Sequence, residues 1–136
     1  MNQEKDSIQK EYEGFLQDAL NHKEVWILDS EEGMACQSSL EYEDRMAILF
    51  WSNGILAEIE RNNEFENLEA HTLPLFELLF QWLPNMQEEG VICGLNWNQE
   101  NGGLEVEPQD LLDHFNMIIP EDMEAEFQEK LSSLDS

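Results

Sequence analysis

Basic side chains are scarce in this sequence. Its 136 residues include 6 Lys and Arg against 31 Asp and Glu, which gives a formal net charge of −25 at pH 7. No Lys or Arg occurs between Asn62 and Glu129. Such a negative field repels the phosphates of nucleic acids and anionic lipids, so we expect neither nucleic acid nor a membrane as a partner. The same field attracts cations, and a basic protein partner is therefore expected.

Long apolar runs are also missing. Residues 1–14 contain no apolar stretch of the kind that a secretion signal carries. No other run approaches the roughly 20 residues that a membrane-spanning helix needs. The sequence therefore predicts a cytoplasmic protein.

Residues that carry reactive or metal-binding chemistry are few and scattered. The two cysteines, Cys36 and Cys93, lie in separate apolar stretches, which predicts buried reduced thiols. The three histidines are far apart, and His114 is expected to be a solvated helix residue. No nucleophile elbow, phosphate-binding loop, calcium loop or zinc motif occurs. The sequence thus predicts a protein that is not an enzyme and that has no cofactor and no metal site.

The aromatic and aliphatic content is that of a folded domain. Hydrophobic residues make up 41% of the chain and include 4 Trp and 7 Phe, which excludes a disordered protein despite the charge. A chain of this length buries roughly two-thirds of its surface on folding. We therefore expect one domain over residues 1–136, with the charged residues outside a real core.

Apolar periodicity in the first half predicts short helices and strands. Residues 7–20 repeat apolar positions at helical spacing, and 24–29 and 34–39 predict a hairpin with its turn near 31–33. Residues 46–51 are apolar on both faces, as in a central strand. Ile55, Leu56 and Ile59 then predict a short amphipathic helix, followed by a polar loop over 61–71.

The second half begins with the most apolar segment. Thr72 and Pro74 are typical of a helix start, and residues 72–83 predict the most buried helix, with a final turn or loop at 85–89. After a predicted hairpin, Pro108 opens a helix that reaches Ile119. Residues 120–136 predict an acidic C-terminal helix with a narrow apolar stripe of Met123, Phe127, Leu131 and Leu134.

The hairpin between these helices follows a period of two. Val91, Cys93, Leu95 and Trp97 are expected on one strand face, toward the core, and 98–103 has turn chemistry before a return strand at 104–107. The resulting order is α-β-β-β-α-α-β-β-α-α. It predicts a single α+β domain with a mostly antiparallel sheet of about five short strands packed with helices.

The four tryptophans lie inside apolar segments, so we expect them in the core before they serve as binding platforms. The polar face of the hairpin and the helix after it remain as the candidate partner-binding surface. The predicted site residues are Asn96, Asn98, Glu100, Glu105, Glu107, Asp110 and Asp113.

Four segments follow one another between Val25 and Phe115: "VWILDSEEGMACQ", "AILFWS", "LPLFELLFQWLPNMQEEGVICGLNWN" and "GGLEVEPQDLLDHF". In this order they resemble the bacterial domain-of-unknown-function family numbered 2750. The resemblance implies a fold and no activity. Small acidic bacterial proteins of this general type also resemble immunity proteins, which cover the basic active site of a secreted toxin.

The sequence therefore favours a protein-binding role of the immunity type, in which an acidic face covers a basic partner such as a toxin domain. Two other functions stay open. One is a small ligand-binding domain or an enzyme, with a pocket between the helix 72–83 and the sheet. The other is a homodimer or structural protein that associates through the C-terminal stripe, unless that helix packs on its own domain.

Overall fold

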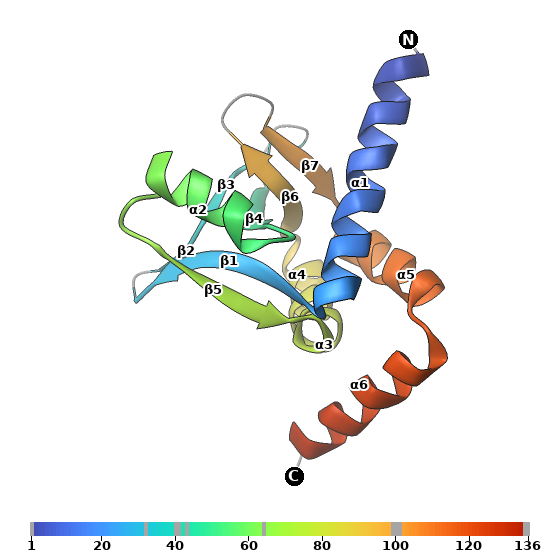
Figure 1. Cartoon of the computed structure of the whole chain (residues 1–136). Coiled ribbons are helices and arrows are strands. Elements are labelled where there is room, and N and C mark those ends of the chain that lie inside the picture. Colours follow the sequence, from blue (N-terminus) through green and yellow to red (C-terminus); the bar gives the residue numbers. More distant parts are fainter. Residues whose placement is uncertain are drawn as a thin grey trace.

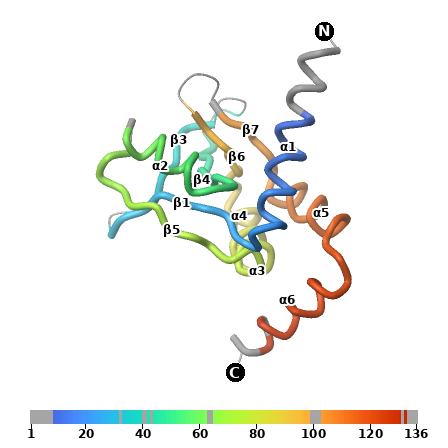
Figure 2. The backbone as a smooth tube through the Cα atoms, in the orientation of Figure 1, coloured from blue at the N-terminus to red at the C-terminus, as the bar shows by residue number. Residues whose placement is uncertain are grey.

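The computed structural model describes residues 2–31, 33–39, 42, 44–63, 65–98 and 102–134. Figures 1 and 2 show helices packed around two small sheets. The predicted α+β fold is confirmed. In chain order the elements are α1 (Asn2–His22), β1 (Glu24–Ser30), β2 (Gly33–Met34), β3 (Cys36–Ser38), β4 (Met46–Phe50), α2 (Gly54–Asn63), β5 (Glu69–Pro74), α3 (Leu75–Glu77), the π-helical η1 (Leu78–Trp82), α4 (Leu83–Glu89), β6 (Ile92–Asn98), β7 (Gly102–Val106), α5 (Pro108–Ile118) and α6 (Glu121–Leu134).

The two sheets have the strand orders β2-β1-β5 and β3-β4-β6-β7. Within the described residues, each pair is antiparallel apart from β4 and β6, which run parallel. β4 therefore lies inside its sheet, as its two apolar faces predicted. Ala35, between β2 and β3, accepts a hydrogen bond from Leu49 N and donates one to Leu28 O. β2 and β3 thus form one bent segment that passes from one sheet to the other.

The core has two hydrophobic clusters, one on each side of the four-stranded sheet. The larger cluster joins side chains of α1, α3, η1, α4, α5 and α6, and among its members are Phe15, Phe50, Leu75, Leu79 and Phe115. The smaller cluster lies between β1, β4, β6 and α2 and contains Leu28, Ala35, Leu49, Trp51, Ala57 and Trp97.

Residues 69–74 form a strand, so the predicted loop up to residue 71 and the helix start at Thr72 are wrong. β5 pairs with β1 from Glu69 to Pro74. It lies at the edge of its sheet, and Leu73 is its one buried residue. Because an edge strand buries few side chains, β5 lacks the apolar alternation by which a strand is recognised.

Residues 85–89, predicted as a final turn or loop, belong to the helix that follows β5 and continues to Glu89. Pro84 lies in the first turn of α4, and the turn before it is π-helical, with Leu83 N bonded to Leu78 O. The wider turn leaves room for the proline ring, which clashes with the preceding turn of an ordinary α-helix. Gly90, with φ of 76°, ends the helix in the left-handed conformation.

The short helix predicted around Ile55 exists as α2, but its apolar side faces water. Ile55 is 75% exposed and Ile59 49% exposed, whereas Ala57 and Glu60 are buried. The layer beneath α2 is already filled by large rings. A Cβ added at Gly54 would lie 2.9 Å from the Trp26 ring. At the start of α2 the Trp26 ring thus leaves no room for a side chain at residue 54.

The two cysteines lie in different surroundings. Cys93 is buried, as predicted, and burial raises the pKa of its thiol far above the ordinary value. Cys36 is exposed, so its predicted burial is wrong. It belongs to β3, which forms the edge of the four-stranded sheet and turns Cys36 and Ser38 outward.

The C-terminal helix α6 packs on its own domain. Phe127 is 1% exposed and its ring lies 6.2 Å from that of Phe76. Glu126 accepts a 2.8 Å ion-pair hydrogen bond from Lys23, and Lys130 lies 5.5 Å from the centre of the Phe76 ring. α6 is therefore held by Phe127, which belongs to the larger hydrophobic cluster, by the partly buried Met123 and by a small group of charges.

Replacing Phe127 by Ala should loosen α6, because the buried ring contributes about 3 kcal/mol or more to packing. We expect faster hydrogen exchange of the amides in Glu121–Leu134 and a lower melting temperature. Met117→Ala, which truncates a side chain that is 79% exposed, should change neither quantity and is the control. Unchanged exchange in Phe127→Ala would contradict this packing.

Candidate functional site

The β6–β7 hairpin contains a bulge that reverses its side-chain alternation. Leu95 pairs with Leu104 and the next pair is Asn98 with Gly102. Cys93 and Leu95 belong to the larger hydrophobic cluster, but Trp97 belongs to the smaller one on the other side of the sheet. The predicted common face of Cys93, Leu95 and Trp97 is therefore wrong, since an extra residue in one strand shifts the alternation. The predicted burial of Trp97 is confirmed, because it is 9% exposed.

Asn96 sits in the bulge and its side chain points to the protein. Its φ of 50° is left-handed, a conformation that Asn tolerates better than most residues. Ser52 N donates to Asn96 Oδ1 at 2.8 Å, and Asn96 Nδ2 donates to Ser52 Oγ at 3.2 Å. Ser52 Oγ in turn donates to Asp18 Oδ2 at 3.2 Å. Asn96 therefore joins the hairpin to the turn after β4 and, through Ser52, to α1, and its prediction as a water-facing residue is wrong.

Glu105 and Glu107 are also engaged inside the protein. Ser39 Oγ donates to Glu105 Oε1. Arg45 forms a bidentate ion pair with Glu107 and donates from Nε to Gly90 O at 2.8 Å. These two carboxylates connect the end of the hairpin to the segment before β4, and they are half-buried instead of facing water as predicted.

The Arg45–Glu107 pair changes the titration of both groups. The guanidinium of Arg45, by its hydrogen bonds, holds the pKa of Glu107 below its ordinary value of 4.5. The same contact raises the pKa of Arg45. Both charges are therefore present at neutral pH, and the pair stays formed.

The other predicted site residues occupy different places. Asp110 and Asp113 are exposed on α5, where Gln109 Nε2 donates to Asp113 Oδ1 at 3.0 Å. Asn98 is half-buried, and Glu100 lies outside the described residues. Asp110 and Asp113 share the exposed side of α5, whereas Asn96, Glu105 and Glu107 take part in internal contacts.

His114 connects α5 to α1, a role that its sequence position did not indicate. Its Nδ1 shares a hydrogen bond with the Tyr12 hydroxyl, and the two rings meet edge to face with centres 5.3 Å apart. Burial, with the negative charge of Asp110, raises the pKa of Tyr12 to about 12. The tyrosine therefore stays protonated, and His114 is an interhelical contact as well as an exposed residue.

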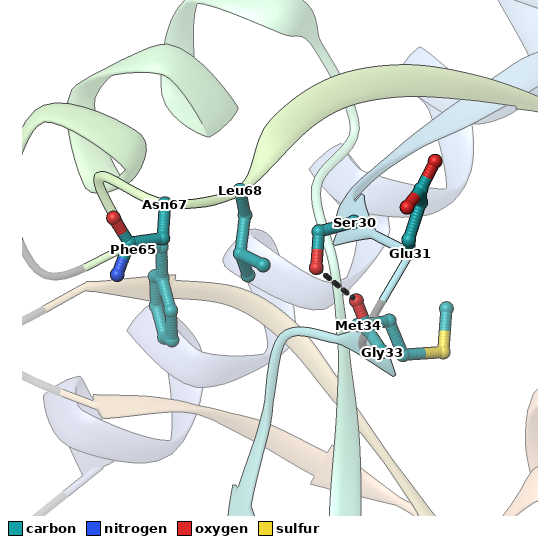
Figure 3. A pocket seen from close by; sticks show the side chains of 7 residues that line it. All are labelled: Ser30, Glu31, Gly33, Met34, Phe65, Asn67 and Leu68. Atoms are coloured by element: carbon teal, nitrogen blue, oxygen red, sulfur yellow. Dashed lines mark hydrogen bonds between the residues drawn. The ribbon is translucent and has the colours of Figure 1, made fainter.

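An open groove lies between the β1–β2 turn and the loop after α2 (Figure 3). Its volume is about 750 Å³. The lining residues are Ser30, Glu31, Gly33, Met34, Phe65, Asn67 and Leu68. Among these described residues Glu31 is the one ionisable group, so they supply no pair of acid and base. The space predicted as a pocket, between the helix 72–83 and the sheet, is occupied by Leu75, Leu78 and Leu79, which are fully buried.

Among the residues that the structure describes, no three His, Cys, Asp or Glu side chains gather as they would around a metal ion. His71 Nδ1 pairs with Asp29 across the β1–β5 ladder, and its Nε2 lies 3.7 Å from Glu69. None of the described helices has the length and apolarity needed to span a bilayer.

One family model matches residues 12–115, from α1 to Phe115 in α5. The chain belongs to DUF2750, a family of proteins of unknown function. The resemblance of the four segments between Val25 and Phe115 is thereby confirmed. The DUF2750 match contains the two-sheet fold, the bulged hairpin and α2, and it ends before α6. Among curated proteins no match to this chain was found.

Asn96→Ala should lower the free energy of unfolding by about 2–3 kcal/mol, because it removes two hydrogen bonds and places an alanine in the left-handed region. Asn96→Gly removes the same bonds without the backbone penalty, so it should be about 1 kcal/mol less harmful. Urea denaturation measures both variants. Equal stability of the two would show that the backbone at residue 96 carries no strain.

Arg45→Gln should raise the pKa of Glu107 toward 4.5, as measured by NMR titration of the carboxyl group. Because the folded pKa of Glu107 is depressed, the pair stabilises the protein above pH 4.5 and this contribution is lost as pH falls below it. The melting-temperature difference between wild type and Arg45→Gln should therefore be present at pH 7 and shrink below pH 4.5. Lys10→Gln removes an equal charge from the exposed side of α1 and should leave the Glu107 pKa unchanged.

Proposed function

We propose that this DUF2750 protein is a non-catalytic binding protein whose acidic surface docks on a basic protein, as an immunity protein covers a toxin domain. The observation that supports this most directly is the net charge of −25. Four of the basic residues are also paired with carboxylates of the same chain, namely Lys23, Arg45, Arg61 and Lys130. The paired basic groups leave a strongly negative surface over the rest of the molecule.

The exposed carboxylates of α5 and the start of α6 are the proposed docking charges. Asp110 and Asp113 are exposed on α5, and Glu121, Asp122 and Glu124 are exposed in the first turn of α6. Figure 1 shows the two helices following one another on the same side of the molecule. Since long-range attraction depends on net and local charge, this surface would speed the encounter with a cationic partner.

The same charge disfavours the alternatives. Two copies of a chain with net charge −25 repel each other, so a homodimer must overcome that repulsion. A small ligand would have to bind in the open groove of Figure 3, whose described lining contains one carboxylate. Neither a homodimer nor such a ligand accounts for the net charge of −25, whereas a basic protein partner does.

The test is capture from the source cell with a tagged full-length chain at low salt, followed by affinity measurements on the protein recovered. We expect a basic protein whose dissociation constant rises at least about tenfold between 50 mM and 500 mM NaCl, because salt screens the attraction. Asp110→Asn/Asp113→Asn should weaken binding. Glu11→Gln/Glu13→Gln removes two exposed charges from α1 and is the matched control. The absence of a specific partner, or an affinity independent of salt, would contradict the proposal.

A further inference from the structure

We infer that the exposed apolar face of α2, formed by Ile55, Leu56 and Ile59, is the anchor on which a basic, amphipathic segment of the partner protein docks. This inference rests on the proposed function and adds the place where apolar contact is made. Charge attraction brings two proteins together, but tight binding needs a buried apolar centre. The α2 face supplies such a centre, because three large apolar side chains are exposed together on one helix.

The orientation of α2 is the first observation. A surface helix ordinarily turns its large apolar residues toward the core and its charges toward water. Here Ile55, Leu56 and Ile59 are 75%, 36% and 49% exposed, while Ala57 is 0% and Glu60 4% exposed. Three large apolar side chains within little more than one turn thus face water together. Contiguous exposed apolar groups of this kind mark interaction sites.

Hydrogen bonds hold both ends of α2 in this orientation. Asn53 Oδ1 accepts a hydrogen bond from Leu56 N at the start of the helix, and Gly54 lies against the Trp26 ring. At the other end, Arg61 Nε donates to Leu68 O at 2.8 Å and Phe65 N donates to Glu60 O at 3.2 Å. Because both ends of α2 are already bonded, a partner that binds its apolar face loses little free energy to ordering the helix.

The charges around the face indicate a basic partner. The side chain of Glu58 on α2 is 51% exposed, that of Glu69 on β5 is 77% exposed, and Glu66 lies exposed in the loop between them. Arg61 is the basic residue of α2, and it contacts Glu58 at 3.6 Å and the Leu68 carbonyl. Exposed carboxylates on α2 and after its C-terminal end, beside an apolar face, complement a segment that carries Lys or Arg beside apolar residues. A second copy would instead bring carboxylates against carboxylates.

The groove of Figure 3 adjoins the end of α2. Phe65, Asn67 and Leu68 come after the helix and form one wall of the groove, and Figure 3 shows them across the groove from Ser30, Gly33 and Met34 of the β1–β2 turn. A partner segment that covers α2 would therefore meet a hollow at the C-terminal end of the helix. An exposed apolar face beside a groove fits an amphipathic segment whose apolar side covers α2 and which places one side chain in the groove.

The experiment uses the full-length chain, labelled with ¹⁵N, and a synthetic 14-residue amphipathic peptide of Lys and Leu. A second peptide with the same Lys residues and Gln in place of Leu separates charge from apolar contact. We expect the Leu peptide to shift the amide signals of Gly54–Asn63 and to bind at least about tenfold more tightly than the Gln peptide.

Ile55→Ser/Ile59→Ser should reduce binding of the Leu peptide at least about tenfold. Both side chains are exposed, so the melting temperature should change little. Met117→Ser/Ile118→Ser, which removes two exposed apolar side chains from α5, should leave binding unchanged and is the matched control. The same pairs of variants can then be measured with the partner recovered by capture.

Three outcomes would overturn the inference. Equal loss of binding in the α2 and α5 variants would show no preference for α2. Amide shifts confined to α5 and α6 would place the docking surface at Asp110 and Asp113, which leaves the proposed function intact. A dimer by light scattering that Ile55→Ser/Ile59→Ser converts to a monomer would assign the face to a second copy. Failure of both peptides to bind, in contrast, would argue against the proposed function itself.

Discussion

The contact between the two sheets at Trp26 and Trp51 is the interaction on which the rest of the structure depends. The two residues exchange backbone hydrogen bonds of 2.7 and 2.9 Å, and these bonds join β1 to the end of β4. Trp51 Nε1 then donates to Trp97 O at 3.0 Å and holds the bulged end of β6. The position of α2 follows from this junction, because Gly54 rests on the Trp26 ring.

The same junction explains which parts of the fold could be predicted from the sequence. Apolar patterns identified β1, β4, the two strands of the β6–β7 hairpin and the burial of Trp51 and Trp97, since these segments are rich in side chains that the core buries. The bulge in β6, which reverses the alternation before Trp97, was missed. β5 was missed because it lies at a sheet edge, and the orientation of α2 was missed because it is set by rings contributed from other strands. Both depend on contacts between residues far apart in sequence.

The candidate site was harder to predict for a related reason. A run of Asn and Glu along a hairpin reads as a water-facing surface, yet Asn96, Glu105 and Glu107 find partners in Ser52, Ser39 and Arg45. Those partners come from segments at least 44 positions away. Although the chain has few basic residues, Arg45 has a structural role. It binds Glu107 and the Gly90 carbonyl and so connects them to the segment before β4.

The parallel pairing of β4 with β6 has a consequence for how the chain is made. Ala47 pairs with Ile92, so one side of β4 has no partner until some 45 further residues have been synthesised. Since domains often begin to fold during synthesis, a nascent chain that ends near Gly90 would contain a finished β1–β5 ladder beside an open strand. An open strand can pair with another chain. The many carboxylates between Glu58 and Glu89 would then protect the unfinished protein, because nascent chains with a high negative charge repel one another.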